Sequence, residues 1–262
     1  MLGAVIGDIA GSRFEHHNCK RKDFELLHPG CRPTDDSVMT IAVAEAILEA
    51  DGDWDRLETA AVACLQRQGR RYPRAGYGGS FRSWLNSDAP QPYNSWGNGA
   101  AMRVSPAGWA GQSLEEARLI ARRVTAVTHN HPEGLKAAEC TAALIFLART
   151  GTPAAALRAE AERWYPLTQT LDEIRPDYRF DVSCMGTMPP ALEALFEAED
   201  YEDAIRGAVS VGGDSDTIAA ICGGMAEALF GIPEELRLQG LGFLDAEQTD
   251  IVSRFEAKYG AK

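Results

Sequence analysis

Helical periodicity organises most of the chain. Between residues 114 and 127, apolar side chains recur at i, i+3, i+4 and i+7, which is the spacing of a helix with one buried face. We find no segment with convincing alternation of polar and apolar residues, so no strand is predicted. Comparable apolar stripes predict helices over 38–50, 135–149, 201–209, 217–230 and 246–258, and further helices from Thr152-Pro153 and from Pro189-Pro190 onward.

These helices are expected to form a single domain. The chain has 262 residues, of which 45% are hydrophobic, and this is enough for one sizeable core. No Pro/Ser-rich linker or low-complexity run divides it. We therefore expect an all-α fold, a single compact bundle of about ten helices that spans residues 1–262.

Residues 1–15 predict an unusual helix of small residues. Gly3, Gly7 and Gly11 recur along it, and Asp8 lies among them. Glycine weakens a helix by about 1 kcal/mol relative to alanine, so this pattern indicates close packing at the centre of the bundle. Glu15 is expected at the helix end, where a carboxylate opposes the helix dipole. That unfavourable placement suggests a functional carboxylate, although surface exposure would also explain it.

Two short acidic clusters carry the strongest chemical signal. Thr34-Asp35-Asp36-Ser37 and Asp214-Ser215-Asp216-Thr217 lie about 180 residues apart, and each begins an apolar helical pattern. Carboxylates and hydroxyls form an all-oxygen ligand set, which selects Mg²⁺, Mn²⁺ or Ca²⁺ over zinc or copper. If the two helix starts meet, they can hold two cations side by side. The alternative is helix capping, because Asp, Ser and Thr are preferred N-cap residues.

Two loops rich in Gly and Asn are candidate ligand cradles. Residues 72–80 include Gly78, Gly79 and Ser80, which precede a short helical pattern. Exposed backbone N–H groups at a helix start bind phosphate well, but a plain helix–helix turn would explain the same residues. The second loop, residues 93–106, contains further Gly and Asn residues.

The histidine and cysteine patterns disfavour a zinc site. In His129-Asn130-His131, the two histidines are two residues apart and do not share a helix face. One satisfied or ligand-facing histidine is the favoured interpretation. The six cysteines are scattered without a CxxC pair, which argues against a zinc knuckle and against a disulfide framework. A reducing cytoplasm is the expected location.

Charge and hydropathy exclude two further classes of function. The formal net charge is −12, so a polyanion would be repelled and nucleic-acid binding is not expected. A small anionic ligand is compatible with this charge, because local cations and oriented N–H groups decide its binding. No apolar run reaches the roughly 18 residues of a membrane span, so no membrane association is expected.

Taken in order along the chain, several short motifs resemble the ADP-ribosylglycohydrolase family, which includes the dinitrogenase reductase-activating glycohydrolases. They run from the first residues to about Phe230. The motifs are Gly7-Asp8-Ile9-Ala10-Gly11-Ser12-Arg13-Phe14-Glu15, Thr34-Asp35-Asp36-Ser37, Gly97-Asn98-Gly99-Ala100-Ala101-Met102-Arg103, Thr128-His129 and Gly212-Gly213-Asp214-Ser215-Asp216-Thr217.

The resemblance implies an all-helical domain with two Mg²⁺ or Mn²⁺ ions at the base of a cleft. By position, the implied metal ligands are Thr34, Asp35, Asp36, Asp214, Asp216 and Thr217. Glu15 matches a mobile acidic residue near the scissile ribose. The implied ligand contacts are Gly78, Gly79 and Ser80 at the pyrophosphate, Ser95, Trp96, Gly97 and Asn98 in a second loop, and His129.

The implied activity is hydrolysis of an ADP-ribosylated protein or of a small-molecule ADP-ribose conjugate. The bond cleaved would be the N- or O-glycosidic bond at ribose C1″. Asp36 or Asp214 would orient the attacking water, and Glu15 would assist proton transfer. The chain is short for the family, and arginine, serine and small-molecule linkages all remain open, as does the oligomeric state.

Two other functions are compatible with the same residues. One is a non-catalytic ADP-ribose-binding or interaction protein on the same fold, since a fold alone does not guarantee turnover. All six implied metal ligands are present, which argues against this alternative. The other is a hydrolase of a different nucleotide-linked riboside that uses the same metals.

Overall fold

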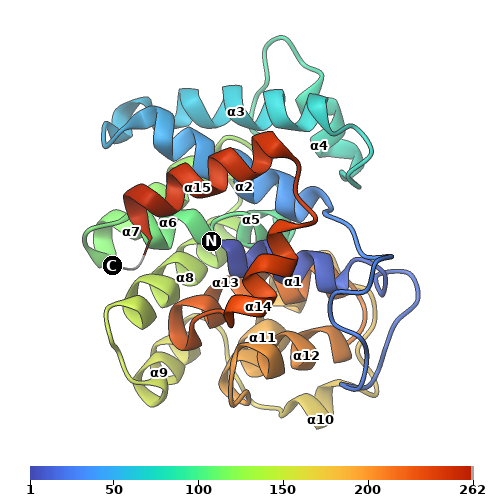
Figure 1. The fold of residues 1–262 in the computed structure, drawn as a ribbon. Helices are drawn as coiled ribbons and strands as arrows, with labels where there is room; N and C mark the ends of the chain where they lie inside the picture. The colour runs from blue at the N-terminus through green and yellow to red at the C-terminus, as the bar shows by residue number, and fades with distance from the viewer. Residues whose placement is uncertain (261–262) are drawn as a thin grey trace.

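The computed structural model describes residues 1–260 and is helical throughout (Figure 1). A short 3-10 helix, η1, spans Trp54–Arg56. The α-helices are α1 (Leu2–Gly11), α2 (Asp35–Ala50), α3 (Leu57–Arg71), α4 (Gly79–Leu85), α5 (Gly99–Met102), α6 (Ser105–Ala110), α7 (Leu114–Ala126), α8 (Pro132–Arg149), α9 (Ala154–Trp164), α10 (Leu171–Ile174), α11 (Cys184–Phe196), α12 (Tyr201–Ser210), α13 (Ser215–Phe230), α14 (Glu234–Leu241) and α15 (Ala246–Tyr259).

The all-α fold predicted from the sequence is confirmed, but the number of helices was underestimated. Among the described residues there are fifteen α-helices, and the five that were not predicted are α3, α5, α6, α10 and α14. Three of these five, α5, α6 and α10, have six residues or fewer. So short a helix presents too few positions for a 3.6-residue period to be recognised. No helix in the described part of the chain is long and apolar enough to cross a membrane.

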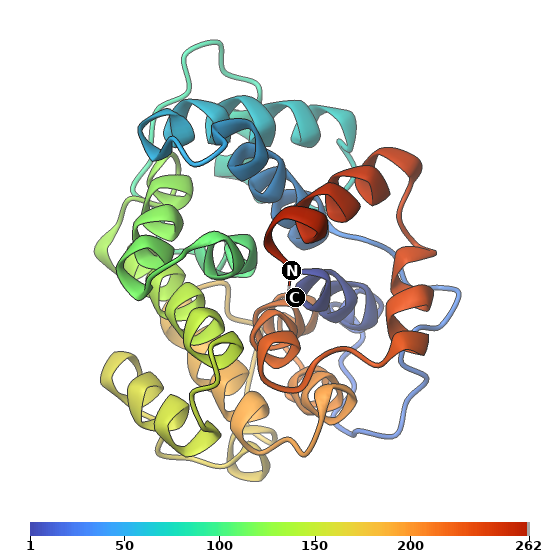
Figure 2. The same cartoon turned by 60° about the vertical axis from the view of Figure 1, so that its left-hand side comes forward.

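Helix α1 lies at the centre of the bundle, antiparallel to α13 (Figure 2). All ten of its residues are buried. A Cβ atom added to Gly7 would lie 2.0 Å from the carbonyl oxygen of Ala219, and one added to Gly223 would lie 2.3 Å from that of Gly3. The two backbones are therefore in direct contact, which confirms the close packing that the small residues predict.

The chain leaves α1 earlier than the sequence suggested. The helix ends at Gly11, and Ser12 then donates its hydroxyl to the carbonyl of Ile9 and accepts the N–H of Arg32. Glu15 consequently lies beyond the helix in a turn. The expectation that Glu15 stands at the helix end, against the dipole, was wrong.

Helix α11 also differs from the prediction. It begins at Cys184, where the Ser183 hydroxyl accepts the N–H of Gly186, and the two prolines lie inside it rather than at its start. Proline has no N–H group, so Pro190 leaves the carbonyl four residues earlier, that of Gly186, without its helical partner. The hydroxyl of Tyr178 donates to that carbonyl at 3.1 Å and so compensates for the lost bond.

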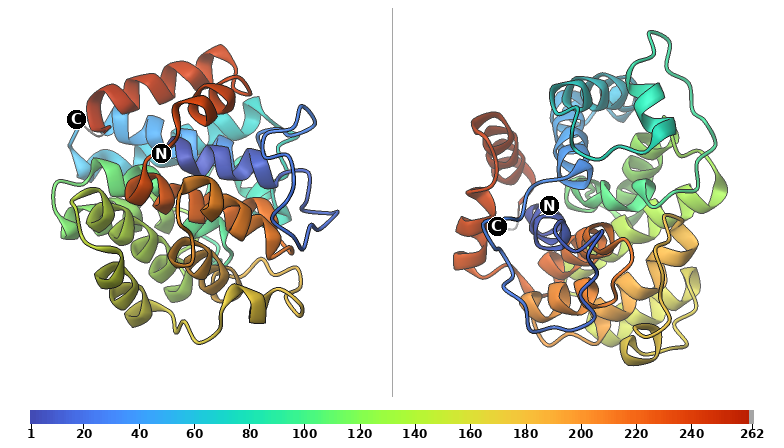
Figure 3. Two further views of the ribbon diagram at one scale, coloured as in Figure 1. Left: turned by 60° about the horizontal axis from the view of Figure 1, so that its bottom comes forward. Right: turned by 90° about the vertical axis from the view of Figure 1, so that its right-hand side faces the viewer.

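Three loop regions lie near the starts of α2 and α13, and they are visible together in the right-hand view of Figure 3. They comprise residues 12–33, residues 86–98 and residues 165–183, the last of which contain the short helix α10. Two of them are joined by an isolated bridge between Gly97 and Ser183. The helices thus form the scaffold, and the loops surround the place where two helix starts converge.

The contact between α1 and α13 gives a direct test of the packing. Gly7→Ala should lower the free energy of unfolding by about 1–3 kcal/mol or more, because the new methyl group has no space. Gly78→Ala is the matched control, since nothing lies within 4 Å of a Cβ built there. Chemical denaturation of both variants decides this, and equal stability of the two would contradict the described packing.

Candidate active site

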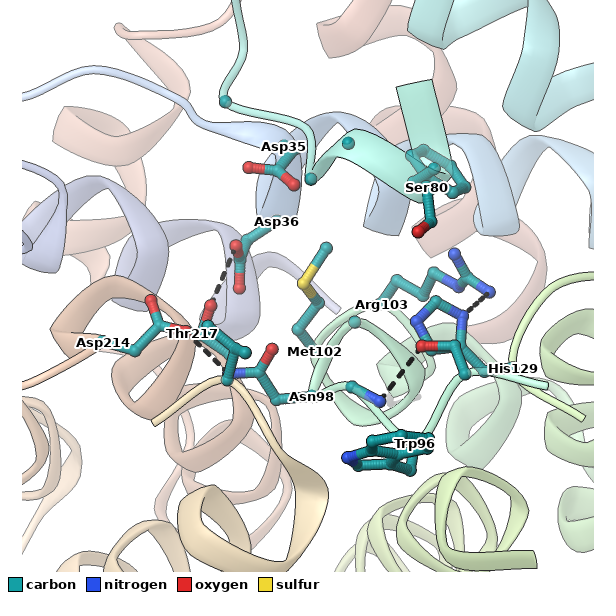
Figure 4. Close-up of a pocket in the computed structure, with 18 of the residues that line it drawn as sticks. Asp35, Asp36, Ser80, Trp96, Asn98, Met102, Arg103, His129, Asp214 and Thr217 are labelled. Carbon is teal, nitrogen blue, oxygen red and sulfur yellow. Dashed lines mark hydrogen bonds between the residues drawn. The ribbon is translucent and has the colours of Figure 1, made fainter. Parts of the chain in front are cut away.

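A pocket of about 620 Å³ opens between the starts of α2 and α13, the segment at residues 76–81 and the segment at residues 93–103. Every site residue predicted from the sequence lines this pocket except Thr34. Those residues are Glu15, Asp35, Asp36, Gly78, Gly79, Ser80, Ser95, Trp96, Gly97, Asn98, His129, Asp214, Asp216 and Thr217. In Figure 4, Asp35, Asp36 and Asp214 stand on one side of the pocket, and Ser80, Trp96 and His129 stand on the other.

The two acidic clusters meet in space. Carboxylate oxygens of Asp8, Asp36 and Asp216 lie within 4.8 Å of one another, and the same holds for Glu15, Asp214 and Asp216. Asp216 belongs to both groups, so the two groups adjoin. This is an arrangement of hard oxygen atoms that could hold a divalent metal ion.

Helix capping does not account for these carboxylates. At the start of α2, the Thr34 hydroxyl accepts the N–H of Asp36 and acts as the cap. At the start of α13, Asp214 makes no side-chain capping hydrogen bond. The acidic side chains are therefore available for another role.

Asp8 is the member of the acidic group that the sequence analysis missed. It is 0% exposed, and it accepts the backbone N–H groups of Thr34 and Ser37 at 2.8 and 3.0 Å. The hydroxyl of Thr34 donates to it at 2.6 Å, and the hydroxyl of Ser37 donates to it as well. Asp8 thus fastens the start of α2 from a different helix. Thr34 lies behind the pocket wall because its hydroxyl faces Asp8.

One buried carboxylate oxygen fits a cation directly. Oδ1 of Asp36 has no hydrogen-bond partner among residues 1–260, while Oδ2 accepts the Thr217 hydroxyl at 3.2 Å. Burial and the neighbouring carboxylates raise the pKa of Asp36 and of Asp216 well above the ordinary value. The same causes raise the pKa of Asp35 to about 7. A cation would relieve this repulsion and satisfy the free oxygen.

Asp214 and Glu15 occupy the outer part of the acidic side. The side-chain amide of Asn98 donates to Asp214 at 2.7 Å and fixes its orientation. Glu15 is partly exposed, and desolvation raises its pKa, although His16 nearby acts in the opposite direction. Glu15 thus combines solvent access with an elevated pKa, as does Asp35.

The opposite wall has no carboxylate and is partly aromatic. A Cβ atom built on Gly78 or Gly79 meets nothing within 4 Å, and neither residue has a positive φ. Neither conformation nor internal packing therefore requires glycine there. Trp96 is 50% exposed at the rim, with its ring 5.5 Å from that of His131.

Arg103 also lines the pocket, although no role was predicted for it. It closes the motif that runs from Gly97 to Arg103, so its place in that motif was the available signal. Tyr93, Phe81 and Phe180 line the pocket too, and no sequence pattern identified them.

A family model described as ADP-ribosylglycohydrolase matches residues 1–260. The chain belongs to the ADP-ribosylglycohydrolase family. This membership confirms the family predicted from the motifs, and with it the prediction of an ADP-ribosyl hydrolase. A solved structure of an ADP-ribosylglycohydrolase-related protein complex superposes with a TM-score of 0.69 at 24% identity, over 98% of this chain and 95% of that one, which shows the fold.

Curated relatives in the family match most of the chain at low identity. ADP-ribosylhydrolase ARH3 of Homo sapiens is 24% identical, over 97% of this chain and 90% of that protein. The ADP-ribosyl glycohydrolase of dinitrogen reductase from Rhodospirillum rubrum is 27% identical, over 89% and 85%. ADP-ribosylarginine hydrolase Tri1 of Pseudomonas putida is 25% identical, over 88% and 70%.

The electrostatics of the acidic group predict that removing the Asp36 carboxylate has opposite effects on stability without and with metal. Asp36→Asn should raise the free energy of unfolding of the metal-free protein at pH 8 by at least about 1 kcal/mol, because a carboxylate whose pKa rises on folding destabilises the fold above its unfolded-state pKa. The effect should vanish below about pH 4. The same variant should lose most of the stabilisation that Mg²⁺ or Mn²⁺ gives the wild type.

Thermal unfolding with and without metal measures both effects. The exposed Asp88→Asn serves as the control for loss of one charge. A less stable metal-free Asp36→Asn, or an undiminished metal effect in it, would contradict the assignment.

Proposed function

We propose that this protein is a metal-dependent hydrolase that cleaves the N- or O-glycosidic bond at ribose C1″ of ADP-ribosylated side chains or small ADP-ribose conjugates. The observation that carries this proposal is the pair of adjoining carboxylate groups on one side of a pocket whose other side has no carboxylate. Its volume of about 620 Å³ is within the range of roughly 300–1,000 Å³ of small-molecule sites.

The acidic side would hold two Mg²⁺ or Mn²⁺ ions. Five of the six ligands that the sequence implied line the pocket at this place, namely Asp35, Asp36, Asp214, Asp216 and Thr217. The sixth, Thr34, does not line the pocket, and its hydroxyl donates to Asp8. When bound, such cations supply Lewis-acid chemistry and lower the pKa of water. The free Oδ1 atom of Asp36 and the raised pKa values around it support this role.

The carboxylates perform the remaining steps. As the bond to C1″ breaks, positive charge develops on the ribose, and nearby carboxylates stabilise it. Asp36 or Asp214 orients the water that attacks C1″, and Asn98 holds Asp214 in place for this. Glu15 has an elevated pKa and solvent access. It assists proton transfer between the attacking water and the departing side chain.

The opposite wall would bind the pyrophosphate and the adenosine half. The space in front of Gly78 and Gly79 lets a phosphate approach the backbone N–H groups closely. Ser80 adds a hydroxyl next to them. The exposed indole of Trp96 and the turn from Gly97 to Asn98 supply the second set of contacts.

Hydrolysis assays on defined conjugates test this function. Peptides with ADP-ribosyl-arginine and ADP-ribosyl-serine, and a small O-linked conjugate, are incubated with Mg²⁺, with Mn²⁺ or with a chelator. We expect release of free ADP-ribose from at least one substrate with metal, and none with chelator. Absence of release from all three, or equal release with chelator, would contradict the proposal.

Glu15 should affect turnover more than binding. We expect Glu15→Gln to lower kcat by about 10²–10⁴-fold, the usual contribution of general acid–base catalysis, while ADP-ribose affinity changes little. Single-turnover kinetics and calorimetry measure the two quantities. Wild-type kcat in this variant would show that Glu15 is not catalytic.

Replacing Gly79 should weaken the binding of ADP-ribose but leave the binding of metal unchanged. A Cβ atom at residue 79 meets nothing within 4 Å, so we expect Gly79→Val to fold, yet its side chain would stand where the pyrophosphate approaches. We expect ADP-ribose affinity to fall at least about tenfold while the metal-induced thermal shift stays at its wild-type size. Ser80→Ala is the milder control, because its backbone N–H group remains. Wild-type affinity in folded Gly79→Val would show that this loop does not bind the pyrophosphate.

A further inference from the structure

Arg103 presents a buried positive charge without a carboxylate partner. It is 1% exposed, follows α5 directly and makes no salt bridge within residues 1–260. Its Nη2 atom donates to the hydroxyl of Thr128 at 2.5 Å and lies 3.3 Å from Nδ1 of His129. Its guanidinium also lies over the ring of Phe81, 5.6 Å from the centroid. A buried cation held by neutral partners needs an explanation.

The contacts of Arg103 determine which nitrogen of His129 carries the proton. A guanidinium donates hydrogen bonds and accepts none. The Thr128 hydroxyl accepts the N–H of Arg103, so its own hydrogen remains to be donated. Nδ1 of His129 lies 2.7 Å from this hydroxyl, and the carbonyl of Thr125 lies 3.4 Å from it. The contact with Nδ1 is the much shorter of the two, so the hydroxyl hydrogen goes to Nδ1 rather than to the carbonyl. The second neighbour of Nδ1, the guanidinium of Arg103, can only donate, and Nδ1 is therefore assigned as the acceptor.

The other ring nitrogen faces the pocket. A Cβ atom built on Gly99 would lie 3.1 Å from Nε2 of His129, and one built on Gly97 would lie 3.7 Å from it. Both glycines line the pocket together with His129, and Figure 4 shows His129 beside Arg103 on the side away from the acidic residues. In a neutral imidazole whose Nδ1 accepts, the single hydrogen is on Nε2.

We propose that Arg103 and Thr128 are positioning residues that fix His129 as a neutral histidine, with its Nε2–H group aimed into the pocket as a hydrogen-bond donor. The ligand atom it serves would be an anionic oxygen. Identifying that oxygen with the pyrophosphate or ribose of ADP-ribose rests on the proposed function, whereas the tautomer rests on the contacts alone.

The surrounding charges keep His129 in this state. Burial and the positive charge of Arg103 lower its pKa well below the ordinary value. The other titratable groups that face this part of the pocket are Tyr93, whose ring is 5.8 Å from that of His129 and whose pKa is raised by burial, and Asp35, which acts on Arg103. His131 contacts Trp96 instead. The donor therefore stays unchanged from pH 6 to pH 8.

Nitrogen-15 NMR of the histidine side chains in the ligand-free protein tests this directly. Between pH 6 and pH 8 we expect the wild-type His129 ring to show a protonated Nε2, an unprotonated Nδ1 and no titration. In Arg103→Met, which keeps the length of the side chain but removes charge and donors, His129 should protonate at higher pH than in the wild type. Thr128→Val should mix the tautomers, and Thr128→Ser should restore the wild-type spectrum.

The outcome for the wild type alone can overturn the proposal. A proton on Nδ1 at pH 7, or titration of His129 near its ordinary pKa, would refute the proposed positioning of His129, even if the Arg103 variant fails to fold. Wild-type tautomers in both Arg103→Met and Thr128→Val would also refute it. None of these spectra depends on hydrolysis. Failure of the proposed positioning of His129 can therefore be distinguished from failure of the proposed function.

A binding measurement separates a positioning role from a merely structural one. The quantity to compare is the ADP-ribose affinity of Arg103→Met divided by that of the wild type. We expect this ratio to be about one tenth at pH 8 and to rise several-fold at pH 6, where the histidine of the variant gains a proton. Taking the ratio cancels the titration of the acidic residues. A ratio that is constant with pH would assign Arg103 to packing alone.

Discussion

Contact between the backbones of α1 and α13 determines where the charged groups of this protein lie. Glycine at positions 3, 7 and 223 lets the two helices approach so closely that no side chain fits between them. This approach brings Asp8 of α1 beside the start of α13, and Asp8 in turn fastens the start of α2 through Thr34 and Ser37. The acidic side of the pocket is therefore a consequence of central packing, and the surface loops add the opposite wall.

The pocket combines two environments that need each other. On one side, several carboxylates are buried together, and their raised pKa values show that the arrangement is unfavourable without positive charge. On the other side, Arg103 is a buried cation held only by neutral partners in the described chain. An anionic ligand that binds metal at one end and hydrogen-bond donors at the other would compensate both sides. ADP-ribose, which the description of this family names, is an anion.

Much of this arrangement could be predicted from the sequence, and the failures have physical causes. The all-α fold followed from helical periodicity, and the close packing of α1 followed from its glycines. The acidic clusters and the Gly-rich loops lie around one pocket. Their resemblance to the motifs of a known family indicated this proximity. Asp8 was missed because its partners lie 26 and 29 residues away, and local patterns carry no information on such contacts. Glu15 was misplaced because the end of α1 depends on the hydrogen bonds of Ser12.

The most direct test of the central claim is the location of bound metal. Crystals grown with Mn²⁺ and ADP-ribose would be measured at a wavelength at which manganese scatters anomalously. We expect two manganese peaks between the starts of α2 and α13, in contact with Asp36, Asp214 and Asp216, and the pyrophosphate beside Gly78 and Gly79. Bound ADP-ribose with no manganese at these carboxylates would contradict the claim that the two acidic helix starts form the catalytic centre.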